Sequence, residues 1–228
     1  VPEQPVREGS ATSHNITPAS VKPATEDNGN ALFTSDMLAQ LNAVFGKMES
    51  KLVLSLGLDS RDSSNELKHY MEELAKLTDK LSVRLEENVD EKEAPYVKVC
   101  REDGSYSGLA FHGIPGGHEF TSFILGLYNV AGPGQQIEDD IKSKIEAVDK
   151  ETKIRLMVSL TCTMCPDLVV AAQRIASLNP KVSTEVYDLN HFPDLRDKYQ
   201  IMSVPCMVIN DGKPNFGKKD ISQVLDLI

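Results

Sequence analysis

The stretch SLTCTMCPDLVVAAQRIASLNPKV, residues 159–182, carries two cysteines three positions apart, Cys162 and Cys165. The apolar run just before them predicts a strand, and the apolar residues after them recur at helical spacing, with Pro166 suited to the first helical turn. A thiol between a strand and a helix lies near the unpaired N–H groups of the first turn, which favours the thiolate. Thiolates attack disulfides, so the pattern is typical of a redox pair in which Cys165 resolves a mixed disulfide formed by Cys162.

Two other interpretations of the pair stay open at this point. Zinc or an iron–sulfur cluster usually takes four ligands, and the only other cysteines, Cys100 and Cys206, lie on predicted strands. Because Cys206 follows Pro205 and could approach the pair, a metal site is one alternative. The other alternative is a pair of buried structural thiols, which the polar residues around the pair disfavour.

The overall composition excludes several classes of partner. The 24 Lys and Arg residues are outnumbered by 34 Asp and Glu, giving a net charge of −10, so we expect no nucleic acid partner. The acidity disfavours an anionic membrane surface, and no apolar run reaches the ~18 residues of a membrane span. Four cysteines in 228 residues are too few for a secreted scaffold built on disulfides, so we expect a cytoplasmic protein.

Residues 1–32 are predicted to be a flexible linker. They contain several prolines among Ser, Thr, Glu and Asn, and their few apolar residues show no period. The triplet Asn15–Thr17 matches the acceptor pattern for N-glycosylation. Since a linker stands at the front and nothing comparable stands at the back, we expect a partner domain upstream.

The rest of the chain falls into two halves with the same order of elements: strand, helix, strand, hairpin and helix. Two pairs of stretches align, at shifts of 101 and 110 residues: 77–85 with 178–186, and 95–99 with 205–209. The difference between the shifts, 110 − 101 = 9, predicts a helix-sized insert in the second half. In the first half we also predict a helix over 35–48, and a capping box of Ser63 and Glu66 at the start of another.

The unit of strand, CxxC and helix, followed by Val204-Pro205 before a late strand, resembles the thioredoxin fold. With the connecting stretch GIPGGHEFTSFILGLYNVAG (113–132), the two halves resemble the N-terminal domain of the alkyl hydroperoxide reductase flavoprotein subunit. Archaeal protein disulfide oxidoreductases share this tandem fold. The resemblance covers residues 33–228 and implies an α/β protein of two fused thioredoxin-like folds, each a central mixed sheet flanked by helices.

The resemblance also implies roles for single residues. Cys162 and Cys165 are expected to be the catalytic pair, and Pro205 the cis-proline whose loop packs against them, with Pro95 as its counterpart in the first half. Glu119, in the GHEF motif, is expected to lie near the pair and to tune its thiols, because a nearby carboxylate can take a proton from the resolving thiol. Its alternative role is a favourable charge in the first turn of a helix, after two flexible glycines.

The first half, 33–132, is expected to have lost its redox cysteines, because the shift of 101 places Arg61–Ser64 on the CTMC motif. The second half, 133–228, then carries the active site. The sequence departs from the resemblance at Thr163-Met164, where family members mostly carry another pair, and at Cys206, for which we expect an inert thiol. His118 is expected to be structural or to face solvent.

We therefore expect a disulfide oxidoreductase that acts as a dithiol/disulfide electron-transfer domain. FAD in a thioredoxin-reductase-like flavoprotein domain, reduced by NADH or NADPH, would reduce the cysteine pair, which would then reduce an acceptor disulfide, by resemblance that of a peroxiredoxin. No G-x-G-x-x-G follows a strand in this sequence, so FAD and the nicotinamide are expected on the partner. The alternatives are a free-standing protein disulfide oxidoreductase or isomerase, and a metal-binding or scaffold module.

Overall fold

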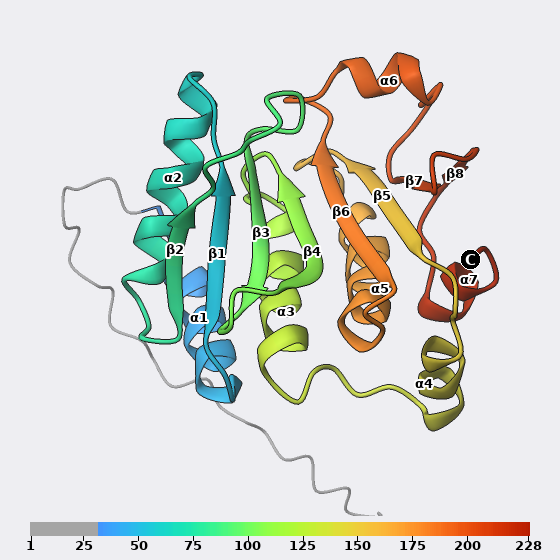
Figure 1. Ribbon diagram of the computed structural model, residues 1–228, viewed down its shortest axis with the longest axis horizontal. Helices are drawn as coiled ribbons and strands as arrows, with labels where there is room; N and C mark the ends of the chain where they lie inside the picture. Colours follow the sequence, from blue (N-terminus) through green and yellow to red (C-terminus); the bar gives the residue numbers. More distant parts are fainter. Residues whose placement is uncertain (1–31) are drawn as a thin grey trace, which may run out of the picture. The chain divides into compact units, whose positions relative to one another are not determined.

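Eight strands within residues 32–228 pair into one mixed sheet in the order β2-β1-β3-β4-β6-β5-β7-β8 (Figure 1). The computed structural model describes residues 32–228, so the predicted linker, apart from Leu32, and the Asn15–Thr17 triplet lie outside the described residues. The strands are β1 (Leu52–Gly57), β2 (Leu81–Leu85), β3 (Tyr96–Arg101), β4 (Tyr106–His112), β5 (Thr152–Val158), β6 (Val182–Asp188), β7 (Cys206–Ile209) and β8 (Pro214–Phe216). The helices are α1 (Ser35–Lys47), α2 (Asp62–Ala75), α3 (Glu119–Ala131), α4 (Asp139–Glu146), α5 (Cys165–Leu178), α6 (Asp194–Lys198) and α7 (Ile221–Leu225).

The two halves repeat the same strand topology. In the first, β1 pairs with β2 in parallel and with β3 antiparallel, and β3 continues into β4 as a hairpin. In the second, β5 pairs with β6 in parallel and with β7 antiparallel, and β7 continues into β8. The helix α6 lies between β6 and β7, where the difference in shifts predicts an insert. The α/β class and the fusion of two thioredoxin-like folds are confirmed.

The halves share one sheet rather than two, because β4 pairs in parallel with β6. The register places Ala110 beside Glu185 and His112 beside Tyr187. Edge strands of two small sheets expose unpaired N–H and C=O groups, and pairing them with each other satisfies both. Sequence pattern predicts a central sheet in each half but not the pairing of β4 with β6 that joins the two sheets.

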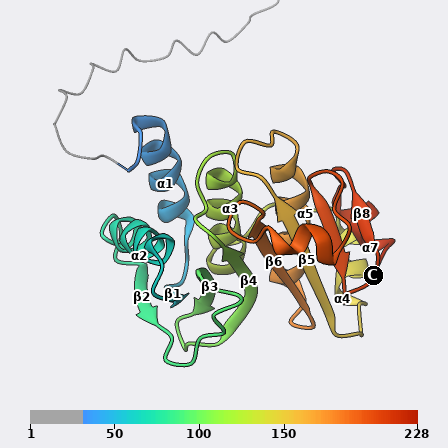
Figure 2. The same cartoon turned by 90° about the horizontal axis from the view of Figure 1, so that it is seen from above.

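The main core lies on one face of the sheet and takes buried side chains from α1, α2, α3, α4, α5 and α7. Figure 2 shows α1, α3 and α5 on the same side of the strands. Side chains alternate along a strand, so Val186 enters this core and Tyr187 enters a smaller cluster on the opposite face, where α6 packs. Among residues 32–228, no helix has both the length and the apolar character needed to cross a membrane.

The helix starts agree with the sequence in most places and differ in one. The predicted first helix begins at Ser35 behind a capping box formed by Thr34, and Pro166 occupies the first turn of α5 as expected. The predicted capping box of Ser63 and Glu66 is wrong, because the N-cap of α2 is Arg61, two residues earlier, and its side chain makes no cap bond. Ser64 is instead bonded to Asp59, with its Oγ donating across 2.7 Å.

Candidate active site

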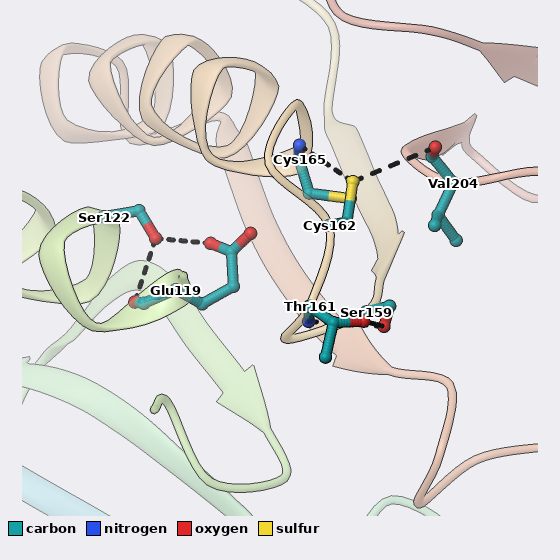
Figure 3. Close-up of a disulfide and its surroundings, with 7 residues drawn as sticks. All are labelled: Glu119, Ser122, Ser159, Thr161, Cys162, Cys165 and Val204. Carbon is teal, nitrogen blue, oxygen red and sulfur yellow. Dashed lines mark hydrogen bonds between the residues drawn. A yellow bond between two sulfur atoms is a disulfide. The ribbon is translucent and has the colours of Figure 1, made fainter. Parts of the chain in front are cut away.

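Cys162 and Cys165 form a disulfide whose Cα atoms are 5.6 Å apart (Figure 3). Cys162 lies in the turn between β5 and α5 and is partly buried, whereas Cys165 opens α5 and has no exposed surface. A spacing of three residues around a helix start places the two Cα atoms at the separation that a disulfide needs. The sulfur that a partner can reach therefore belongs to Cys162.

The start of α5 points a donor at that sulfur. The backbone N–H of Cys165 donates to Cys162 Sγ across 3.1 Å. This N–H belongs to the first turn of α5, which has no internal acceptor for it, and the N-cap residue Met164 supplies no side-chain cap. In the reduced protein the donor and the positive end of the helix stabilise a thiolate at Cys162.

The loop before β7 lies against the same sulfur. Pro205 follows a cis peptide bond with Val204, as the resemblance implies, and the Val204 carbonyl oxygen is 4.0 Å from Cys162 Sγ. Ala94 and Pro95 are joined by a cis bond at the matching place in the first half. The Val204 backbone therefore borders the accessible side of the disulfide.

Glu119 is the first residue of α3 and has no exposed surface. The Ser122 hydroxyl donates to one carboxylate oxygen and lies 3.0 Å from the Glu119 carbonyl oxygen, while the other carboxylate oxygen, Oε1, has no hydrogen-bond partner. Burial raises the pKa of Glu119 to about 7, against the smaller lowering effect of the Ser122 hydrogen bond. Figure 3 shows the unpartnered oxygen pointing toward the first turn of α5, where Cys165 lies. A carboxyl group of this pKa can exchange a proton near neutral pH.

The start of α3 is tied to the cysteine turn through the main chain. The N–H of His118 donates to the Leu160 carbonyl across 2.9 Å, two residues before Cys162. Gly117 has φ of +53°, and a Cβ there would lie 2.7 Å from that same carbonyl oxygen. Gly117 is therefore required by a close approach of two backbones, rather than by flexibility as the sequence suggests. The His118 side chain is exposed.

The first half has a polar cluster where the second half has the disulfide. The guanidinium of Arg61 donates to Asp59 and also to the Ala94 carbonyl oxygen, at 2.7 and 2.5 Å. Ala94 precedes cis-Pro95 just as Val204 precedes cis-Pro205, so Arg61 takes the place of Cys162 against the equivalent carbonyl. In the first half, a charged and hydrogen-bonded side chain thus occupies the place that a sulfur atom occupies in the second half.

Comparison with known proteins supports this arrangement. Residues 152–224 match the family model described as Thioredoxin domain. The crystal structure of the NTD_N/C domain of alkylhydroperoxide reductase AhpF from Enterococcus faecalis superposes with a TM-score of 0.80 at 37% identity, covering 86% of this chain and 99% of that one. This chain belongs to the family of AhpF N-terminal domains.

Two other relatives of this AhpF-type domain are longer proteins. The alkyl hydroperoxide reductase AhpF of Pseudomonas aeruginosa is 30% identical over 85% of this chain, and a protein of Bacillus subtilis named NADH dehydrogenase is 29% identical over 84%. The chain spans 37% of the length of each. A protein disulfide oxidoreductase from Aeropyrum pernix has the same fold, with a TM-score of 0.72 at 21% identity.

The two remaining cysteines of the AhpF-type domain do not join the pair. Cys206 is fully buried in the cluster on the face of the sheet opposite the core that contains Cys165, and burial raises its pKa to about 11. Cys100 is buried in the first half, and burial raises its pKa as well. Across residues 32–228, no group of three or more His, Cys, Asp or Glu side chains is arranged to hold a metal ion.

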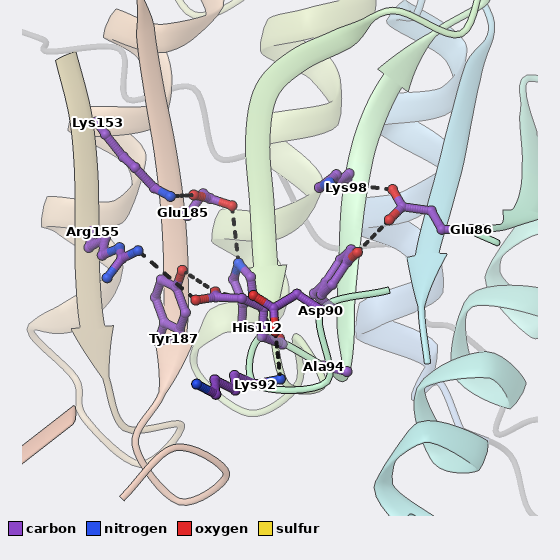
Figure 4. A network of polar contacts seen from close by, with 12 residues as sticks. Glu86, Asp90, Lys92, Ala94, Lys98, His112, Lys153, Arg155, Glu185 and Tyr187 are labelled. Atoms are coloured by element: carbon purple, nitrogen blue, oxygen red, sulfur yellow. Dashed lines mark hydrogen bonds and ion pairs between the residues drawn. The ribbon is translucent and has the colours of Figure 1, made fainter. Parts of the chain in front are cut away.

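A buried polar network at the junction of the halves was missed by the sequence analysis (Figure 4). His112 on β4 places Nε2 3.2 Å from the Glu185 carboxylate on β6 and Nδ1 2.7 Å from the Glu93 carbonyl oxygen. Its ring stacks on Tyr187, whose hydroxyl donates to the Glu93 carboxylate across 2.6 Å. Burial raises the pKa of Glu185, but His112 and Lys153 outweigh it and hold the pKa at about 2. No local sequence pattern predicts this network, because its residues come together only when β4 pairs with β6.

Proposed function

We propose that this AhpF-type domain is a dithiol/disulfide electron-transfer domain, with Cys162 and Cys165 as its catalytic pair. The observation that carries the proposal is the disulfide at the start of α5, with the Cys165 N–H aimed at the sulfur that also borders the Val204 carbonyl. Thiol–disulfide exchange needs an accessible sulfur that can be stabilised as a thiolate and a second thiol within one turn, and the positions of the two cysteines support these roles.

The exchange proceeds in two displacements. The Cys162 thiolate attacks one sulfur of the acceptor disulfide, forming a mixed disulfide and expelling an acceptor thiolate. Cys165 then gives its proton to Glu119 and attacks Cys162 Sγ, which restores the Cys162–Cys165 disulfide and expels the second acceptor thiolate. Two electrons leave this domain, one proton moves to Glu119, and the two acceptor thiolates take protons from water.

Pro205 and its loop are proposed to position the acceptor. The Val204 carbonyl oxygen borders Cys162 Sγ, so an extended acceptor segment can pair with this backbone while its disulfide meets the sulfur. The half 33–132, in which Arg61 replaces the thiol, is proposed to act as a scaffold that supplies Glu119 to the active site of the half 133–228.

The electrons are proposed to come from FAD in a thioredoxin-reductase-like flavoprotein domain, fused to this one, that NADH or NADPH reduces. The acceptor is proposed to be a peroxiredoxin disulfide. The names of the relatives support both, since the Pseudomonas aeruginosa relative is named as part of an alkyl hydroperoxide reductase and the Bacillus subtilis relative is named NADH dehydrogenase.

A thiol-trapping redox titration tests the central step. The protein is equilibrated across graded dithiothreitol buffers, alkylated, and mapped by mass spectrometry. We expect one reversible two-electron transition confined to Cys162 and Cys165. A Cys162–Cys165 disulfide that does not form and break reversibly, or thiols that bound metal protects from alkylation, would contradict the proposal. Reduction by a separately purified thioredoxin-reductase-like flavoprotein with NADH, compared with NADPH, then tests the electron source.

A further inference from the structure

A cavity of about 780 Å³ is lined by residues of α3, α5 and α7 and of the connector between the two halves, residues 132–138. The guanidinium-bearing side chain of Arg174, on α5, lies on its wall and is only 7% exposed. The wall also includes the apolar side chains of Leu125, Ile137, Val170, Ala171 and Ile221. Small-molecule sites in proteins have this size and this combination of an apolar wall with a few buried polar groups.

Arg174 has few partners for a buried charge. Its Nε has no hydrogen-bond partner, and its Nη1 makes one long hydrogen bond, 3.4 Å to the Ser177 hydroxyl. Within residues 32–228 it forms no ion pair, and burial lowers its pKa with no carboxylate opposing the effect. A guanidinium nevertheless keeps its charge at neutral pH, and a buried charge without a partner destabilises the fold. Arg174 is therefore an anion-binding group whose partner is missing among the described residues.

The connector is shaped around this guanidinium. Gly134 has φ of +78°, and a Cβ there would lie 2.3 Å from Arg174 Nη1. The next residue is fixed by Asn129, whose side chain accepts from the Gln135 N–H across 2.8 Å and donates to Gln135 Oε1 across 2.9 Å. The connector thus holds Arg174 in one place on the cavity wall by close packing, and this packing does not neutralise its charge.

The other charged side chains on the wall are more exposed and have partners. Asp167 and Lys218 lie 3.8 Å apart as an ion pair. Lys219 donates to two backbone carbonyl oxygens, and Asp220 caps the start of α7. The cavity therefore offers one buried positive charge, which matches a ligand with one negative charge, and its apolar wall matches a hydrocarbon group.

We propose that this cavity binds a small organic monocarboxylate with an apolar body, whose carboxylate accepts hydrogen bonds from Arg174. The planar fork of a guanidinium suits the two oxygens of a carboxylate, and the hydrocarbon body gains affinity as its surface is buried. Neither cysteine of the redox pair lies on the cavity wall, so this binding is independent of the proposed electron transfer.

Isothermal titration calorimetry on the full, oxidised chain tests the ligand class. Octanoate is the probe, and three comparison compounds each lack one of its features. Acetate has the carboxylate without the apolar body, octanol has the body without the charge, and sulfate is an anion without a body. We expect saturable binding of octanoate, with each comparison compound at least about tenfold weaker. No saturable binding of octanoate, equal binding of octanol, or equal binding of sulfate would overturn the proposal.

Two variants on the same wall test the assignment of Arg174. Arg174→Met removes the charge and keeps an apolar stem, and it should fold because it removes an unpaired buried charge. We expect it to weaken octanoate binding by about tenfold or more. Lys218→Met removes an equal charge from an exposed position and should change the affinity by less than about twofold. Wild-type affinity in Arg174→Met would make this arginine merely structural.

A third variant keeps Arg174 and tests the space beside it. Val170→Phe places a larger side chain on the cavity wall from α5 and leaves the guanidinium unchanged. We expect it to weaken octanoate binding by about tenfold or more, because the hydrocarbon body loses its place. Wild-type affinity for octanoate in this variant would overturn the cavity as the binding site. Because every measurement uses the oxidised protein, a failure of thiol–disulfide exchange would leave these outcomes unchanged.

Discussion

The backbone N–H of Cys165 donates a hydrogen bond to the sulfur of Cys162 across 3.1 Å. The bond makes the two cysteines unequal, because the helix that begins at Cys165 stabilises negative charge on the sulfur that precedes it and not on its own buried sulfur. The order of attack proposed for the exchange follows from this asymmetry.

Replacing one cysteine at a time should separate the two roles. Cys165→Ser should trap a stable mixed disulfide between Cys162 and an acceptor protein, because no resolving thiol remains. Cys162→Ser should form no such adduct, since the remaining thiol has no exposed surface. We expect turnover in both variants to fall at least about 100-fold, measured as insulin reduction with dithiothreitol as the electron source. An equal yield of adduct from both variants would refute the assignment.

Replacing Glu119 should change the pH dependence of the resolving step. The carboxylate is the form that accepts the proton, and burial raises its pKa to about 7, so the wild-type rate should rise as pH increases through about 7. Glu119→Gln should be slower at pH 8 by about 100-fold and should lack this rise. Rapid-quench kinetics from pH 5.5 to 8.5 measure the rate of the resolving step. A variant that keeps the wild-type pH profile would exclude Glu119 as the base.

The same variant should be more stable than wild type at alkaline pH. Glu119 has a raised pKa in the folded protein, so the folded state binds more protons than the unfolded state between pH 4.5 and about 7, and stability falls as pH rises through this range. A shift from 4.5 to about 7 corresponds to about 3 kcal/mol of unfolding free energy. Urea unfolding should show Glu119→Gln gaining up to this amount over wild type at pH 8, and little at pH 4. Parallel pH curves for the two proteins would contradict the buried ionisation.

Replacing His112 should lower the stability of the folded protein and leave thiol–disulfide exchange unchanged. His112→Leu leaves the Glu185 carboxylate buried with Lys153 as its remaining partner, and breaking a buried pair costs about 3 kcal/mol. The control His191→Leu removes a more exposed histidine whose Nε2 is 4.0 Å from Asp188, and should cost less than about 1 kcal/mol. Urea unfolding at pH 7 compares them. Equal stabilities would show that the network does not hold the junction.

Cys206 and Cys100 should stay unreactive in the folded protein. Both are buried and burial raises the pKa of each, so the reactive thiolate is scarce. In the reduced native protein, iodoacetamide at pH 8 should label Cys162 first and leave these two unlabelled until urea is added. The variant Cys206→Ser should titrate in dithiothreitol buffers as wild type does. A changed transition would place Cys206 in the redox chemistry.

Several features of the site follow from short stretches of sequence. The strand, CxxC and helix unit, with Pro166 in the first turn, predicts where Cys162 and Cys165 lie, because local periodicity and capping depend on neighbours a few residues away. The internal repeat predicts the shared order of elements and the insert that became α6, since a duplicated chain keeps its spacing.

Contacts between segments that are distant in the sequence could not be predicted from local pattern and are seen only in the tertiary structure. The pairing of β4 with β6, the network around His112 and the placement of Cys206 across the sheet from the disulfide depend on strand order and on which face a side chain takes. The burial of Glu119 and its unpartnered oxygen depend on how α3 packs against α5. Local sequence pattern predicts the CxxC pair at a helix start, and the resemblance that rests on it implies the fold family that the structure shows. The surroundings of the pair are visible only in the folded protein, because burial and charge are set by residues that are far apart along the chain.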